Sequence, residues 1–158
     1  MDSANPTTSL GVLQLDADLT WVADYTDRWI ETWARPNSDK PTYWHMVHDV
    51  LSCKLLLSSR IIDRLPQAGG TTPHQQGVLL ETSLRIFNLA LSIPGATHMT
   101  HRASIFAFAG AVILRFGDRR DLVLRLSLRM AGDPAAACVP TFVGNAGKQL
   151  LAMLWYVL

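Results

Sequence analysis

The stretch HRASIFAFAGAVILRF, residues 101–116, decides the fold of this chain. It carries no charge between Arg102 and Arg115, and its apolar residues fall on every side of a helical wheel. A helix that is apolar all round is normally buried on all sides. This one is too short to cross a bilayer, which needs about 20 apolar residues. We therefore predict an all-α protein of about six helices packed around a central apolar helix at residues 101–116.

The other helices are predicted from apolar periodicity and from the prolines and glycines that separate them. Their ranges are residues 16–34, 41–65, 73–92, 118–131 and 141–156. We expect an N-terminal arm at residues 1–15 and a single helical domain at residues 16–158, since a chain of 158 residues fits one domain. The chain is 49% apolar and 17% charged, which argues against disorder.

Aromatic residues recur at every fourth position of the first predicted helix. They are Trp21, Tyr25, Trp29 and Trp33. This spacing places them along one slowly drifting face. Because aromatic side chains dominate core packing, we predict that this face is buried. The charged residues of the same helix are then expected on its solvent side: Asp24, Asp27, Arg28 and Glu31.

The cysteines and the two ends of the chain bear on its environment. Cys53 and Cys138 are isolated, so we predict buried thiols in a reducing compartment. The N-terminal residues lack the basic and apolar regions of a secretory signal, so we predict an intracellular protein. The chain ends in LWYVL, residues 154–158, whereas most domains end in a polar tail. We expect this end to dock on its own core or to form a homo-oligomer contact.

The sequence HMVHD on the second predicted helix carries the candidate catalytic residues. His45 and His48 are three residues apart and share a helix face, and Asp49 is four residues from His45. These groups could perform acid–base chemistry. No serine or cysteine has the context of a nucleophile, so the sequence leaves open whether the chain is an enzyme. The alternative is that the histidines are partly buried hydrogen-bonding groups.

A ligand pocket is the second candidate site. His98 and His101 repeat the spacing of the first histidine pair, and two such pairs could meet as metal sites in helical bundles do. We assign no metal and no cofactor. We expect instead that an apolar pocket for a small apolar ligand is lined by Trp29, Trp33, Trp44, His98 and His101.

Nucleic acid and membrane are not expected as partners. The net charge is +1, so the chain has no overall field that attracts either. Five arginines gather near the fifth predicted helix: Arg115, Arg119, Arg120, Arg125 and Arg129. Asp118 and Asp121 interrupt them, and no aromatic residues that could stack on bases accompany them. We predict a solvated face there, with Arg125 and Arg129 on the outer side.

Three segments together resemble the C-terminal region of fungal zinc-cluster transcription factors. They are the W-x3-Y-x3-W-x3-W pattern, YWHMVHDVLSCKLLLSS at residues 43–59, and IFAFAGAVILRF at residues 105–116. The resemblance covers about residues 19–116. It implies an all-helical regulatory region of a nuclear transcription regulator, which in that family controls activity and in some members senses small molecules.

The chain departs from this family in one respect. The family binds DNA through a six-cysteine cluster that holds two zinc ions, and this chain has two cysteines. It therefore cannot bind DNA in the family's way. We expect a regulatory or interaction domain without its own DNA-binding module. The alternative is a small helical protein that binds a small molecule, or an enzyme, with a Trp-lined pocket beside His45, His48 and Asp49.

Overall fold

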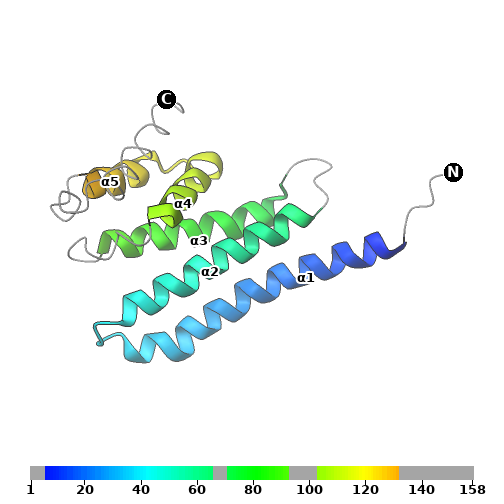
Figure 1. The fold of residues 1–158 in the computed structure, drawn as a ribbon, viewed down its shortest axis with the longest axis horizontal. Coiled ribbons are helices and arrows are strands. Elements are labelled where there is room, and N and C mark those ends of the chain that lie inside the picture. The colour runs from blue at the N-terminus through cyan, green and yellow to red at the C-terminus, as the bar shows by residue number, and fades with distance from the viewer. Residues whose placement is uncertain (1–5, 66–70, 93–102, 132–158) are drawn as a thin grey trace. The chain divides into compact units, whose positions relative to one another are not determined.

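The computed structural model describes residues 6–65, 71–92 and 103–131, and every regular element in these ranges is helical (Figure 1). The all-α prediction is confirmed for them. The elements are α1 (Pro6–Trp29), the π-helix η1 (Ile30–Ala34), the 3-10 helix η2 (Arg35–Asn37), α2 (Tyr43–Arg64), α3 (Pro73–Ser92), α4 (Ala103–Phe116) and α5 (Arg120–Ala131). The predicted helix at residues 141–156 lies outside the described residues.

The predicted helix boundaries agree with the structure for α3 and differ at the starts of α2 and α1. α3 has the predicted range, and Pro73 is its first residue. α2 begins at Tyr43 rather than at Pro41, which lies in the preceding turn. α1 begins at Pro6, well before the predicted start at residue 16. Proline is favoured in the first turn of a helix, where its missing N–H needs no partner, and this explains the early start.

The chain divides into two compact units, with the boundary between Leu79 and Leu80 inside α3. In the first unit, α1 and α2 lie side by side and pack against each other (Figure 1). Along α1 and η1 the buried apolar residues are Leu19, Val22, Ile30 and Ala34, and along α2 they are Val47, Leu51, Leu55 and Ile62. No helix in the described ranges is long and apolar enough to cross a membrane.

The prediction that the aromatic face of the first helix is buried is wrong. Trp21, Tyr25 and Trp33 are 58%, 49% and 64% exposed. The buried residues have the same four-residue period but follow the aromatics by one position: Val22, Thr26, Ile30 and Ala34. These side chains are smaller, and small side chains let two helix backbones approach closely. The helix therefore turns its small residues toward α2 and leaves most of the rings in solvent.

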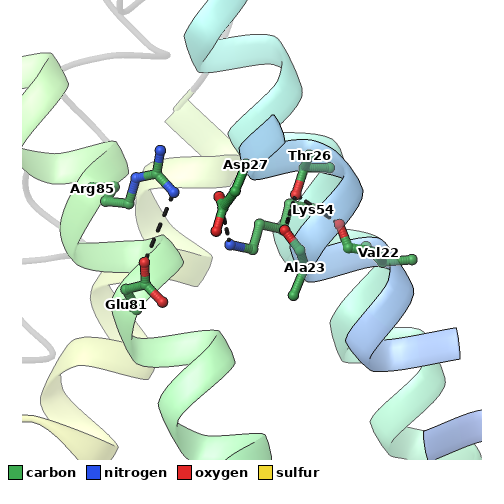
Figure 2. A network of polar contacts seen from close by, with 7 residues as sticks. All are labelled: Val22, Ala23, Thr26, Asp27, Lys54, Glu81 and Arg85. Carbon is green, nitrogen blue, oxygen red and sulfur yellow. Dashed lines mark hydrogen bonds and ion pairs between the residues drawn. The ribbon is translucent and has the colours of Figure 1, made fainter. Parts of the chain in front are cut away.

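A buried lysine also joins α1 to α2. Lys54 is 1% exposed, and its Nζ donates a hydrogen bond of 3.1 Å to Oδ1 of Asp27, which is 39% exposed (Figure 2). On α1, the buried Thr26 hydroxyl donates back to the carbonyl oxygens of Val22 and Ala23. Asp27 was expected on the solvent side. It instead forms an ion pair with Lys54, in which the lysine is buried and the aspartate is partly exposed.

The second unit contains a core of aromatic and aliphatic side chains. The rings of Phe87 on α3 and Phe106 on α4 meet edge to face, with centroids 6.3 Å apart and planes at 90°. α5 contributes Leu122, Val123 and Leu126, as its periodicity predicts. α4 is buried at Phe106 and Ile113 but exposed at Ala111. Its central place in a six-helix arrangement stays a prediction.

The sequence predicts Arg129 on the outer side of α5, but in the structure its side chain reaches α3. Its Nη1 donates to the carbonyl oxygens of Ala90 and Leu91, at 2.9 and 2.8 Å. These carbonyls belong to the last turn of α3, where the helix offers them no N–H partner, so a cation there is favourable. At the other end of α5, Arg119 hydrogen-bonds Asp121 and lowers the pKa of that exposed carboxyl group.

Candidate functional site

The helical path from α1 to η2 changes its winding next to a proline. The backbone N–H of Arg35 bonds to the carbonyl oxygen of Ile30, five residues earlier, so residues Ile30–Ala34 form a π-turn. Pro36 has no N–H to donate, and in an α-helix its ring would clash with the carbonyl of Thr32. A wide turn before the proline and a 3-10 turn around it relieve this conflict. Such π-turns are frequent at functional sites.

Exposed aromatic rings lie along the helix that leads into this turn. Trp21 and Tyr25 stack nearly parallel, with ring centroids 4.9 Å apart and planes at 13°. Among the described residues, Trp33, within the π-turn, is the most exposed of the large aromatic side chains. We call Trp21, Tyr25 and Trp33 the aromatic face. Exposed apolar rings are costly in water, and a gathering of them is typical of contact surfaces in proteins.

A hollow of about 240 Å³ opens on the same stretch of helix. Its lining residues are Tyr25, Arg28, Trp29, Thr32 and Trp33, and we call it the aromatic hollow. All of them belong to α1 and η1. The π-turn begins directly after Trp29 and includes Trp33, so the angular offset between these two residues differs from the α-helical offset between Trp21 and Tyr25. The change of winding thus accompanies the opening of a concave surface.

Two polar contacts hold the far side of the π-turn. The exposed pair Glu31 and Arg35 is one helical turn apart and forms a salt bridge. The amide nitrogen of Asn37 donates to the carbonyl oxygen of Trp33 at 2.7 Å. Glu31, Arg35 and Asn37 are not among the lining residues of the aromatic hollow, whereas Trp33 is. The two acidic side chains closest in sequence to Arg28 are both paired with other residues, because Asp27 contacts Lys54 and Glu31 contacts Arg35.

The three candidate catalytic residues lie in different surroundings on α2. His48 is buried, and its Nδ1 lies 3.2 Å from the hydroxyl of Ser52, which also donates to the backbone carbonyl of His48. His45 is half-buried and its ring stacks on that of Trp44, with centroids 3.5 Å apart. Asp49 is exposed. None of the three lines the aromatic hollow.

The remaining predicted site residues fall into two groups. Trp29 and Trp33 line the aromatic hollow, whereas Trp44 does not. His98 and His101 lie outside the described residues. Within the described ranges, no group of three or more His, Cys, Asp and Glu side chains is placed to hold a metal ion. The assignments of a pocket and of catalytic roles stay predictions.

The prediction that Cys53 is buried is wrong, because its thiol is free and exposed. On α2 the inward positions are taken by His48, Leu51, Lys54 and Leu55, and Cys53 lies outside this series. Its neighbour Lys54 is buried instead. Cys138 lies outside the described residues.

Replacing His48 by alanine is expected to reduce stability rather than to expose a catalytic role. His48 is buried and touches Ser52, so its loss should lower the free energy of unfolding by about 1–3 kcal/mol. Asp63→Ala is the matched control, because this exposed side chain on α2 should change stability by less than about 0.5 kcal/mol. Urea unfolding followed by circular dichroism measures both. Equal stability of the two variants would contradict a structural role for His48.

Sequence reasoning missed three of the hollow's residues: Tyr25, Arg28 and Thr32. Tyr25 was assigned to the core and Arg28 to a solvated face, and Thr32 was not considered. The signal that could have identified them is Pro36, four residues after Thr32 in a helical pattern, because proline at this spacing disturbs the helix ahead of it.

Comparison with protein families, curated proteins and solved structures finds no match to this chain.

Proposed function

We propose that the chain is a regulatory or interaction domain that contacts a partner protein through its aromatic face. The observation that supports this most is the exposure of Trp21 and Tyr25 on α1 and of Trp33 on η1, which continues it. Protein interfaces are enriched in tryptophan and tyrosine, and a few such side chains supply most of the binding free energy. The face needs no catalytic group to serve this purpose.

The finer parts of the proposal rest on the sequence pattern. The resemblance to the regulatory region of fungal zinc-cluster transcription factors supports a role in transcription regulation and a nuclear location. The apolar end at residues 154–158 supports a homo-oligomer contact through a sixth helix. The apolar character of residues 101–116 supports a central position for α4 in the complete arrangement.

A tethering experiment tests the regulatory role. The chain is fused to an unrelated DNA-binding domain in fungal cells, and expression of a reporter gene under the matching DNA site is measured. We expect the fusion to change reporter expression and Trp21→Ser to abolish most of this change. An interface tryptophan typically contributes about 2 kcal/mol or more, which corresponds to a loss of roughly 30-fold in affinity.

Leu128→Ser is the matched control for this substitution. Leu128 is an exposed apolar side chain, 56% exposed, on α5. It should leave the reporter response unchanged, and immunoblots should show equal amounts of all fusions. A wild-type fusion with no effect on the reporter would contradict the regulatory role. A Trp21→Ser fusion as active as the wild type would contradict the aromatic face as the contact surface.

Small-molecule binding is the second candidate function, and the aromatic hollow is the observation that favours it. The hollow combines three aromatic side chains with one cation and one hydroxyl group. Binding sites for small molecules have this composition of apolar walls and few polar groups. The two candidate functions are compatible, because a bound ligand would alter the surface that a partner contacts.

A further inference from the structure

We propose that the aromatic hollow binds a planar aromatic carboxylate, an inference that rests on the second candidate function and names its ligand class. The occupant is a flat ring system of one or two fused rings that carries one carboxylate. Three properties of the hollow support this choice: the nature of its walls, the sign of its charge and its size.

The walls of the hollow favour a flat, apolar body. Tyr25, Trp29 and Trp33 present three ring systems within two turns of helix. Aromatic pairs in stacked or edge-to-face contact gain about 0.5–1.5 kcal/mol beyond the area that they bury. The Tyr25 ring also stacks on the ring of Trp21, at 4.9 Å between centroids. One wall is therefore already oriented before any ligand arrives, which reduces the cost of binding.

The charge of the hollow favours an anion. Arg28 is the single charged residue in its lining, and no carboxylate is among the lining residues. Within the described part of the chain, Arg28 forms no ion pair. A guanidinium group and an indole N–H can only donate hydrogen bonds, and the hydroxyl groups of Tyr25 and Thr32 can donate as well. A ligand that only accepts, such as a carboxylate, complements this set.

The size of the hollow favours a ligand with one or two rings. An engineered cavity of about 150 Å³ in another protein accepts benzene. The hollow measures about 240 Å³ and opens to solvent on one side. It thus has room for a naphthalene-sized body, and its opening leaves a charged end in reach of solvent; Arg28 of the lining is itself exposed. Larger cofactors with several rings and phosphates exceed this volume.

The test is an NMR titration that follows the indole N–H signals of the tryptophans. The probe is naphthalene-2-carboxylate, for which we expect a Kd on the order of 0.5 mM from the usual binding free energy per atom of small ligands. The signals of Trp29 and Trp33, assigned by substitution, should shift with concentration. Two comparison probes separate the contributions: naphthalene-2-carboxamide lacks the charge, and cyclohexanecarboxylate lacks the aromatic ring. Both should bind at least about fivefold more weakly.

Variants of the chain provide the second arm of the test. Arg28→Gln should weaken binding of the carboxylate about fivefold and leave the carboxamide unaffected. Trp33→Leu should weaken both naphthalene probes. Arg60→Gln is the control, because Arg60 is an exposed arginine on α2 and should not alter binding. Circular dichroism of each variant verifies that it is folded.

The outcomes that overturn the inference are specific. They are the absence of shifts at Trp29 and Trp33 at about ten times the expected Kd, equal affinity for acid and carboxamide, and unchanged affinity in Arg28→Gln. These results leave the tethering experiment untouched, because that experiment uses Trp21, which does not line the hollow. Conversely, an inactive fusion together with selective binding of the carboxylate would reject the regulatory role alone.

Discussion

Replacing Phe106 by alanine is expected to lower the free energy of unfolding by about 3–5 kcal/mol. Phe106 is 1% exposed, and its ring meets Phe87 edge to face at 6.3 Å between centroids. Alanine removes the whole ring, loses the aromatic contact and leaves a cavity that neighbouring side chains can fill only in part. Small domains are stable by about 5–15 kcal/mol, so this loss is a large part of the total.

Phe106→Leu is the matched control for this prediction. It keeps an apolar side chain of intermediate size and should cost roughly half as much or less. Urea unfolding curves monitored by circular dichroism give both values, provided that the slope with urea stays constant. A loss below about 1 kcal/mol for Phe106→Ala would contradict the core position of this ring.

The helical class and several helix boundaries could be predicted from the sequence for a physical reason. A helix repeats its side-chain directions every 3.6 residues, and proline excludes itself from most helix interiors. α3, which begins at Pro73, has the predicted range. The early start of α1 was missed because Pro6 and the small polar residues after it are typical of a loose arm.

The orientation of α1 could not be predicted from its period alone. Two series with the same four-residue spacing run along this helix, one large and aromatic and one small. Hydrophobicity favours burial of the rings, whereas close packing on α2 requires the small residues Thr26 and Ala34 to face inward. The two series have the same period and are offset from each other by one residue, so periodicity cannot show which of them is buried. Which series is buried depends on the shape of the α2 surface that it packs against.

Part of the candidate site was predictable. Trp29 and Trp33 were predicted as part of the lining of an apolar pocket. The hollow, however, depends on the π-turn at Ile30–Ala34, and the winding of a helix next to Pro36 is a local compromise that no hydrophobic pattern encodes. Arg28 became part of the hollow for the same reason. The charge of Arg28 predicted a solvent-exposed position, and the side chain is indeed exposed while it also lines the hollow.

The burial of Lys54 was the least predictable feature, and it leads to the prediction with the sharpest internal control. Asp27→Asn is expected to lower the free energy of unfolding by about 2–4 kcal/mol, because it leaves an ammonium group at 1% exposure without its carboxylate. The estimate is below the upper values for buried pairs, since Asp27 itself is 39% exposed and water screens it. Glu31→Gln breaks the exposed pair with Arg35 and should cost less than about 1 kcal/mol.

Lys54→Met should be close to neutral or stabilising, although it removes the same ion pair. Methionine keeps the length of the lysine stem and has no charge to desolvate, and replacement of buried ion pairs by apolar side chains is often tolerated. The double variant Asp27→Asn with Lys54→Met should therefore recover most of the stability that Asp27→Asn loses. Thermal and urea unfolding of the four proteins complete a double-mutant cycle. If Lys54→Met were as destabilising as Asp27→Asn, and the double variant no better, the ion pair itself would stabilise the contact of α1 with α2. If only Asp27→Asn were destabilising, the carboxylate would act mainly by neutralising a lysine that the fold has enclosed.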